Sequence, residues 1–339
     1  RFFKIKMKYK NFLVTGGAGF IGSHLVEKLT EDKKNKIFVI DNLSNGKKSN
    51  LQKVYKKIKF INCDLSDTKK MEKISFLMKK IDCIIHLAAL ADIVPSIDNP
   101  RKYFDSNVIG TLNILEISKK LNVKKLIYIA SASCYGIPKN YPTNENANID
   151  TQYPYALTKY IGELMVQHWG SVYNINYTSL RLFNVYGPRS RTSGSYGAVM
   201  GVFLAQKLKN KPFTIVGDGK QTRDFTFVSD VVDAILLIIK KSKSKNKIFN
   251  VGSEKSVSVN YITNFLKGPK INIPKRPGEP KKTFADINYI KKELGWKPKI
   301  KIDEGLKILL DNIDEWRSAP IWTKSKIKKA TNSWFKFLK

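Results

Sequence analysis

The segment Asn11-Phe-Leu-Val-Thr-Gly-Gly-Ala-Gly-Phe-Ile-Gly22 decides the fold of this chain. Its apolar start predicts a buried strand, and the pattern that follows predicts a helix over Ile21–Thr30. Glycines recur between the two elements at every third position, so the chain can turn tightly and its backbone N–H groups can approach a pyrophosphate. The N-terminus of the helix adds positive partial charge. We therefore predict a dinucleotide-binding loop made by Gly16, Gly19, Phe20, Ile21 and Gly22.

The residues after the next three predicted strands complete this site. Asp41 ends the strand predicted over Lys36–Asp41, about 20 residues beyond the loop, where a carboxylate accepts from the adenosine ribose and repels a 2′-phosphate. This favours NAD over NADP as the cofactor. The third and fourth strands are predicted over Lys59–Cys63 and Cys83–Leu87. Their ends place further predicted cofactor contacts, which are Asp64, Leu65, Leu87, Ala88 and Ala89.

Apolar β-like runs alternate with helical patterns through the first half of the chain, which is typical of βαβ units. We predict an α/β fold: a Rossmann-type doubly wound parallel sheet with a smaller C-terminal substrate domain. The nucleotide-binding domain is expected over residues 7–187 with 212–251 interleaved, and the substrate domain over 188–211 and 252–318. The tail 319–339 carries Trp322, Trp334, Phe335 and Phe337, a spacing that predicts packing on the body. Further predictions are helices over Tyr103–Leu121, Tyr155–Val172, Val231–Ile239 and Leu306–Trp316, and strands over Lys125–Ala130, Tyr177–Phe183, Phe225–Val228 and Lys247–Val251.

Composition excludes several classes of protein. The net charge of the 339 residues is +33, but the excess is mostly lysine spread along the chain. This spread favours compositional drift in an AT-rich genome over a nucleic-acid partner, and a field that steers anionic substrates is an intermediate interpretation. No apolar run reaches 18 residues, so no membrane insertion is expected. Three cysteines and three scattered histidines predict no metal site and a cytoplasmic location.

Tyr155 and Lys159 stand four residues apart within a predicted helix. Their side chains should project from the same face, about 5–6 Å apart at Cβ. An ammonium so close would favour the phenolate and lower the tyrosine pKa toward neutrality. We therefore predict that Tyr155 exchanges protons with a substrate.

A series of motifs resembles a known family. The chain is similar to the extended short-chain dehydrogenase/reductases that modify nucleotide-diphosphate sugars, over about Lys10 to Trp316. The segment Asp41-Asn42-Leu43 resembles that of UDP-galactose 4-epimerase and its UDP-N-acetylglucosamine relatives. The matching segments, in order, are Gly16–Gly22, Asp41–Leu43, Cys63–Leu65, His86–Ala89, Asn107, Ser131–Gly136, Tyr155–Lys159 and Phe183–Arg189.

The resemblance implies roles for individual residues. Tyr155 would take the proton of a sugar 4-hydroxyl, Ser131 would donate to the same oxygen, and Lys159 would hold the nicotinamide ribose. The implied cofactor residues further include Asn42, Asn107, Tyr155 and Lys159. The family's substrate contacts fall on Ser131, Ser133, Asn184, Arg223, Arg276, Glu279 and Thr283, with the arginines on the diphosphate and Glu279 on the nucleotide ribose. A threonine at position 283, in place of a bulky tyrosine, implies room for N-acetylhexosamines.

The residues that follow Ser131 differ from those of several related enzymes, which reduces the number of reactions that the resemblance allows. Ala132 and Ser133 stand where 4,6-dehydratases carry Asp-Glu, and decarboxylases carry glutamate at the place of Ser133. Cys134 is one residue late for an epimerase-reductase and is expected to be a small buried hydrophobe. We therefore expect an NAD-dependent 4-epimerase acting on a UDP-sugar, as a homodimer through the long helices. The alternatives are a UDP-glucuronate 4-epimerase, in which Arg189 and Arg191 could meet the carboxylate, a dehydratase or decarboxylase with its acid supplied from elsewhere, and a non-catalytic dinucleotide sensor or polyanion binder.

Overall fold

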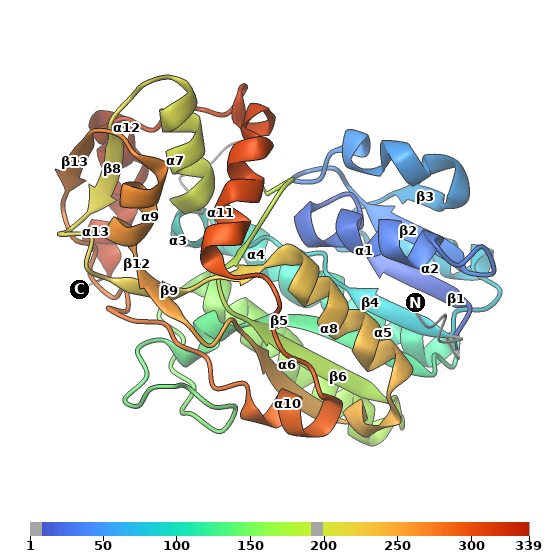
Figure 1. Cartoon of the computed structure of the whole chain (residues 1–339). Coiled ribbons are helices and arrows are strands. Elements are labelled where there is room, and N and C mark those ends of the chain that lie inside the picture. Colours follow the sequence, from blue (N-terminus) through green and yellow to red (C-terminus); the bar gives the residue numbers. More distant parts are fainter. Residues whose placement is uncertain (1–8, 191–198, 339) are drawn as a thin grey trace.

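A parallel sheet of seven strands forms the centre of the molecule (Figure 1). The computed structural model describes residues 9–190 and 199–338. The strand order is β11-β6-β5-β4-β1-β2-β3, and every neighbouring pair in the sheet is parallel. The strands are β1 Asn11–Thr15, β2 Lys36–Asp41, β3 Lys59–Asn62, β4 Cys83–His86, β5 Lys125–Ser131, β6 Tyr177–Leu182 and β11 Lys247–Val251.

Helices cover both faces of this sheet because successive strand residues point to opposite sides. Phe12 and Val14 of β1 pack with α1 and α8, whereas Leu13 packs with α2 and α5. The predicted doubly wound architecture is thus confirmed. The covering helices are α1 Phe20–Thr30, α8 Val228–Lys240 and α10 Asn288–Leu294 on one face, and α2 Thr68–Leu77, α5 Gly110–Lys120 and α6 Pro154–Val172 on the other.

The strand order reverses at β1, which lies between β4 and β2. Chain connections leave this point in opposite directions and open a crevice at the carboxyl ends of the strands, where α/β proteins bind ligands. The loops that follow β1, β2, β4 and β5 all reach this edge.

A second hydrophobic core lies beyond the edge, at the left of Figure 1. Its elements are α7 Val199–Leu208, α9 Val259–Leu266, α11 Ile302–Asp311 and the parallel pair β8 Phe213–Val216 and β13 Lys270–Ile273. Two short strand pairs connect it to the main sheet. They are β7 Val185–Tyr186 with β10 Thr226–Phe227, and β9 Thr222–Asp224 with β12 Ser256–Ser258.

Several elements differ from their predicted bounds or domain. The helix predicted over Leu306–Trp316 is α11 followed by the 3-10 turn Ile313–Trp316. Strand β8 falls within 212–251, yet its buried residues Phe213 and Ile215 pack in the second core because β13 pairs with it there. The strand predicted over Phe225–Val228 ends at Phe227, where α8 begins. The helix predicted over Tyr103–Leu121 is α4 Pro100–Phe104, a π-helical turn Asp105–Ile109 and α5.

The C-terminal tail packs on the body through part of its aromatic set. Ile327 is buried in the second core and Trp334 is also buried, whereas Phe335 and Phe337 are exposed. Shorter elements complete the described chain. They are α3 Ile93–Asp98, α12 Lys324–Ala330, α13 Asn332–Phe337, and the 3-10 helices Lys48–Lys57, Ala132–Tyr135, Ser242–Ser244 and Ile313–Trp316.

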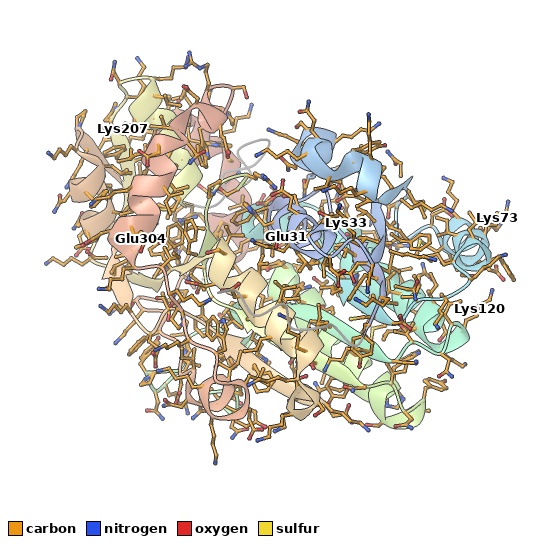
Figure 2. The ribbon with its side chains drawn as sticks, turned by 45° about the vertical axis from the view of Figure 1, so that its right-hand side comes forward. Glu31, Lys33, Lys73, Lys120, Lys207 and Glu304 are labelled. Atoms are coloured by element: carbon orange, nitrogen blue, oxygen red, sulfur yellow. The ribbon has the colours of Figure 1, made fainter. Side chains whose placement is uncertain are left out.

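Charged side chains project from all parts of the surface (Figure 2). Lys33, Lys73, Lys120 and Lys207 belong to separate elements or loops. The spatial spread parallels the spread along the sequence. Among the residues that the structure describes, no helix has both the length and the apolar character needed to cross a membrane.

Candidate active site

One cavity of about 630 Å³ brings the predicted residues together. It runs from the carboxyl ends of the sheet strands to the second core. Every predicted site residue except Asn107 lines it. At the sheet end these are Gly16, Gly19, Phe20, Ile21, Gly22, Asp41, Asn42, Asp64, Leu65, Leu87, Ala88 and Ala89, and farther along Ser131, Ser133, Tyr155, Lys159, Asn184, Arg223, Arg276, Glu279 and Thr283.

The glycine loop has the shape of a cradle that side chains would fill. Gly16 has φ +69°, and a Cβ there would lie 2.7 Å from the backbone nitrogen of Ala88. A Cβ at Gly22 would lie 2.2 Å from the carbonyl oxygen of Gly16. No side chain caps the N-terminus of α1, whose first N–H groups are therefore available to an anion. These features fit the pyrophosphate of a dinucleotide.

Asp41 ties this loop to the end of β2. Its carboxylate accepts from the backbone N–H of Ala18 over 2.9 Å and from that of Leu43 over 2.8 Å. Burial raises the pKa of Asp41, and the two hydrogen bonds counteract the increase. Because each carboxylate oxygen has two lone pairs, both oxygens can also accept from ribose hydroxyls. Asn42 donates to Asp64 over 2.8 Å at the same wall.

Ser131 and Tyr155 meet at the middle of the cavity. Ser131 is the last residue of β5, and Tyr155 lies in the first turn of α6, which Pro154 begins. The Ser133 hydroxyl donates to the Ser131 hydroxyl over 2.9 Å, and hydrogen bonding to the two serines lowers the pKa of the Tyr155 phenol. This arrangement provides a chain of exchangeable protons at one point of the cavity.

The prediction that Lys159 lowers the pKa of Tyr155 is wrong for this structure. Burial raises the pKa of Tyr155, hydrogen bonding to Ser131 and Ser133 counteracts the increase, and Lys159 is not among the main causes of the change. The Lys159 ammonium lies over the ring of Tyr128, 4.3 Å from the ring centroid. Burial lowers the pKa of Lys159 to about 7. The desolvation cost of a charge therefore exceeds the expected cation–phenolate attraction.

Asn107 lies behind the cavity wall, with 1% of its surface exposed. Its amide exchanges hydrogen bonds with the backbone of Leu90 over 2.8 and 3.0 Å and donates to Thr158 Oγ1 over 3.0 Å. It therefore joins the segment after β4 to α6, the helix that carries Tyr155. The resemblance implied a place for Asn107 among the cofactor residues, and the structure sets it against Leu90, which lines the cavity.

Glu279 joins two arginines at the far end of the cavity. Its carboxylate contacts Arg223 Nη2 at 2.8 Å and Arg276 Nε at 2.9 Å. Guanidinium groups held in this way present planar donors to a phosphate. Asn184 donates to Thr283 Oγ1 over 2.9 Å and fixes the threonine that was predicted to set the pocket width.

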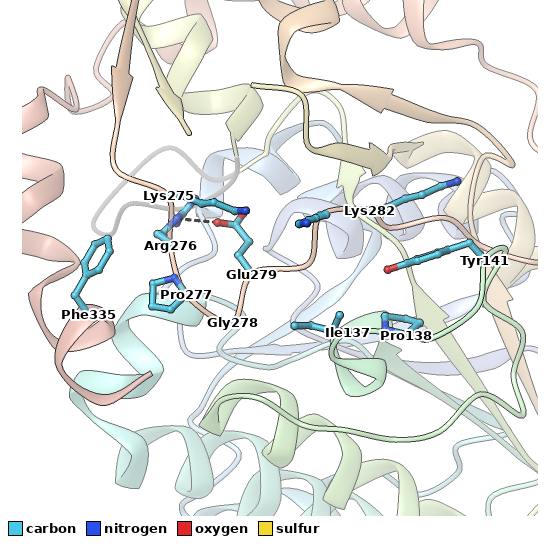
Figure 3. A pocket seen from close by; sticks show the side chains of 11 residues that line it. Ile137, Pro138, Tyr141, Lys275, Arg276, Pro277, Gly278, Glu279, Lys282 and Phe335 are labelled. Atoms are coloured by element: carbon cyan, nitrogen blue, oxygen red, sulfur yellow. Dashed lines mark ion pairs between the residues drawn. The ribbon is translucent and has the colours of Figure 1, made fainter. Parts of the chain in front are cut away.

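A second cavity of about 770 Å³ adjoins the loop of residues 275–282, which carries Arg276 and is the arginine loop (Figure 3). The side chains of Lys275, Arg276, Glu279 and Lys282 reach it from one segment, and Phe335 of the tail closes one side. Glu279 and Arg276 line both cavities, so the second is an outer part of the same cleft.

Tyr153 and Trp334 are among the aromatic residues of the main cavity that sequence reasoning did not assign to the site. Tyr153 precedes α6 and Trp334 belongs to α13, and their ring centroids lie 6.1 Å apart. The Tyr-Pro-Tyr sequence at 153–155 was a local signal for the first. Nothing local connects Trp334 with the cavity, because their proximity depends on the path of the tail.

The other residues that the sequence singled out, Cys134 and Arg189, have surroundings typical of structural residues. Cys134 is buried and burial raises its pKa to about 12, as expected for a small hydrophobe. Arg189 forms an ion pair with Glu27 of α1 at 2.9 Å, whereas Arg191 lies outside the described residues. Within residues 9–190 and 199–338, no group of histidines, cysteines and carboxylates could hold a metal ion.

Comparison with known proteins agrees with this geometry. A model of the NAD dependent epimerase/dehydratase family matches residues 12–252. The chain belongs to this family. As a member, it is an enzyme whose cofactor is NAD, and the glycine cradle and Asp41 are the part of the cavity that fits it.

Similar members of the family carry names with different sugars. The chain is 40% identical to a putative UDP-glucose 4-epimerase of Methanocaldococcus jannaschii, covering 87% of this chain and 95% of the relative. It is 35% identical to a UDP-glucuronate 4-epimerase of Thermodesulfobacterium geofontis, over 87% and 94%. A solved UDP-N-acetylglucosamine 4-epimerase of Methanobrevibacter ruminantium M1, in complex with UDP-N-acetylmuramic acid, is 35% identical with a TM-score of 0.82, over 90% and 100%. Overall identity therefore does not select one sugar.

Proposed function

We propose that this family member is a nucleotide-sugar 4-epimerase that acts on a UDP-hexose by transient oxidation at C4. The observation that carries the proposal is the single cavity in which Ser131 and Tyr155 lie between the glycine cradle and the arginine pair. A nucleotide sugar spanning this cavity would place its sugar beside Tyr155 when its diphosphate contacts the arginines.

The roles of the residues follow from their chemistry. Bound NAD supplies the acceptor and donor of the C4 hydride. Tyr155 takes the proton from the 4-hydroxyl and later returns it, and Ser131 donates a hydrogen bond to the same oxygen. Lys159 lies one helical turn beyond Tyr155 and holds the ribose next to the reacting ring.

Epimerisation requires the sugar to turn while its nucleotide stays in place. Arg223 and Arg276 are suited to bidentate contacts with the diphosphate, and Glu279 to a ribose hydroxyl. Asn184 adds an amide from the substrate side. The absence of an acid at Ala132 and Ser133 supports simple epimerisation, because elimination of water needs a further proton donor there.

The test is incubation of the purified enzyme with UDP-glucose, UDP-N-acetylglucosamine and UDP-glucuronate, without added NAD. Proton NMR should reveal the 4-epimer of at least one sugar. The variant Tyr155→Phe, which keeps the ring but loses the hydroxyl, should lower the rate about 10²–10⁴-fold. Failure of the wild-type enzyme to epimerise any nucleotide sugar would reject the proposal. Salt-dependent retention on nucleic acid without turnover would instead favour a polyanion binder.

We further propose that N-acetylhexosamines fit the pocket. Thr283 is small, and its hydroxyl is held by Asn184 and by the backbone N–H of Asp224 over 3.0 Å. Replacing Thr283 by tyrosine should reduce turnover of UDP-N-acetylglucosamine more than that of UDP-glucose. Equal losses on both sugars would contradict the assignment. UDP-glucuronate is the alternative substrate, but Arg189, paired with Glu27, gives it little support.

One carboxylate supports the runner-up reaction. Asp92 lines the cavity and lies close enough to Tyr155 to raise the pKa of the phenol. It is the candidate acid for a dehydratase or decarboxylase. Mass spectrometry of the product distinguishes these reactions, because loss of water or carbon dioxide changes the mass and epimerisation does not.

The proposal extends to assembly and location. Leu157 and Leu164 are exposed on α6 at a spacing of two turns, which supports a homodimer through α5 and α6. Light scattering should then give twice the chain mass of 38.7 kDa. Three buried free cysteines support a cytoplasmic location.

A further inference from the structure

Trp334 connects the C-terminal helix α13 with the arginine loop. Its indole is 2% exposed, and its Nε1 donates to the carbonyl of Pro277 over 2.7 Å. The Arg276 guanidinium carbon lies 5.2 Å from the centroid of the same ring. Trp334 therefore fixes both the backbone and the charged group of this loop.

On its other side, Trp334 is connected to Tyr155 through the ring of Tyr153. The ring of Tyr153 lies 6.1 Å from that of Trp334 and 6.5 Å from that of Tyr155, almost parallel to the latter at 4°. The three rings form a continuous series along the cavity wall. The indole thus lies between Arg276, the proposed diphosphate ligand, and Tyr155, the proposed base.

The neighbouring residue of α13 also lies beside this loop. Phe335 lines the outer cavity with Lys275, Arg276 and Pro277 (Figure 3). Gly278 follows with φ +67°, and a Cβ there would meet no atom within 4 Å. The turn at Gly278 therefore has little packing of its own, and its orientation depends on the contacts of Arg276, Pro277 and Glu279.

We propose that α13 is a clamp on the substrate site and that Trp334 is its positioning residue. The indole holds Arg276 in the orientation that binds the diphosphate of the nucleotide. The inference rests on the proposed function for the identity of the ligand, but it can be tested by binding alone. It predicts that the tail contributes to affinity for the nucleotide and not to affinity for NAD.

The experiment compares Trp334→Ala and Trp334→Phe with Phe337→Ala in the full-length, NAD-loaded enzyme. Phe337 lies on the same helix but is 61% exposed, so its variant is the matched control. Isothermal titration with UDP gives Kd without turnover, and kinetics with the accepted sugar give kcat and KM. We expect Trp334→Ala to raise the Kd of UDP and KM about tenfold and to lower Tm, because a buried indole is removed, with the NAD content of the folded enzyme and both constants of Phe337→Ala unchanged.

Trp334→Phe keeps a ring beside Arg276 and loses the donor to Pro277, so it should raise Kd about threefold. It also provides the test if Trp334→Ala does not fold. A Kd for UDP within about twofold of the control in the folded variants would overturn the clamp, as would parallel losses of UDP and NAD binding. If the wild-type enzyme binds UDP but epimerises nothing, the proposed function fails while the binding comparison still decides the clamp.

Discussion

The hydroxyl of Ser133 donates to the hydroxyl of Ser131 over 2.9 Å, beside the phenol of Tyr155. Ser131 can donate in turn to the tyrosine oxygen, so the two serine hydroxyls form a short hydrogen-bonded chain that ends at Tyr155, the proposed base. The helix that carries Tyr155 and the strand that carries Ser131 come from different parts of the chain. Their convergence links the catalytic proposal to the packing of α6 on β5.

Replacing Ser131 by alanine should lower kcat about 10²-fold and change its pH dependence. The hydrogen bond from Ser131 lowers the pKa of Tyr155 against the effect of burial, so its loss should raise that pKa. The rise of kcat/KM with pH, which follows ionisation of Tyr155, should then move to higher pH. Ser133→Ala should move it less, because Ser131 remains. An unchanged pH profile in Ser131→Ala would contradict this.

Stability should decrease in acid because of His86. Burial lowers the pKa of this imidazole to about 3, and its nitrogens lie 2.7 Å from Thr15 Oγ1 and 3.0 Å from Thr111 Oγ1. Between about pH 3 and 6.5 the unfolded state binds more protons, so the free energy of unfolding falls as the pH is lowered through this window. The loss should reach the order of 5 kcal/mol over the whole window, of which about 3 kcal/mol should be present at pH 4.5. Chemical denaturation of the wild type and of His86→Gln at pH 7.5 and 4.5 measures it, and equal decreases in both would be evidence against His86.

A buried ion pair should make Glu163 important for folding. Its carboxylate contacts Arg181 Nη2 at 2.5 Å, with side-chain exposures of 1% and 5%. Glu163→Gln leaves the guanidinium without its counter-charge and should cost about 3–5 kcal/mol in the free energy of unfolding. Glu31→Gln removes the partner of Lys28 in an exposed pair and should have no measurable effect. Similar urea midpoints for the two variants would contradict the prediction.

Gly16 should be needed for NAD binding because a side chain there would meet backbone. Gly16→Ala places a Cβ 2.7 Å from Ala88 N at a positive φ, so the loop must shift and retain less NAD after purification. Gly278→Ala has almost the same φ and meets no atom within 4 Å, so it controls for backbone strain alone. Cofactor content by absorbance of released NAD should fall only in the first variant. A similar loss in both would assign the effect to strain.

Local patterns were enough to predict the fold and most of the cavity. Apolar strands, the glycine spacing and Asp41 are short-range features, and each lies where the sequence placed it. The pKa of Tyr155 was predicted in the wrong direction because helical spacing does not report burial. A single asparagine in a family motif does not show whether its side chain contacts the cofactor or supports the cavity wall, as Asn107 does through Leu90 and Thr158.

The features that could not be predicted from the sequence depend on packing between segments far apart in the chain. Trp334 enters the cavity from a helix nearly 180 residues after Tyr155, and β8 joins the second core only because β13 pairs with it. Neither contact leaves a mark in the neighbouring sequence. The roles of the cavity residues remain predictions that the experiments above can decide.

The position of Glu279 between Arg223 and Arg276 has a consequence for selectivity among anions. The Glu279 carboxylate already neutralises part of the charge of the two arginines. An entering anion therefore has to compete with a carboxylate that is held permanently beside them. Chloride, with a single charge and no fixed geometry, competes poorly. If the arginines bind the diphosphate as proposed, such a dianion can engage the N–H groups that Glu279 leaves available on both guanidinium groups at once, so the carboxylate acts as a threshold against the small ions of the cell.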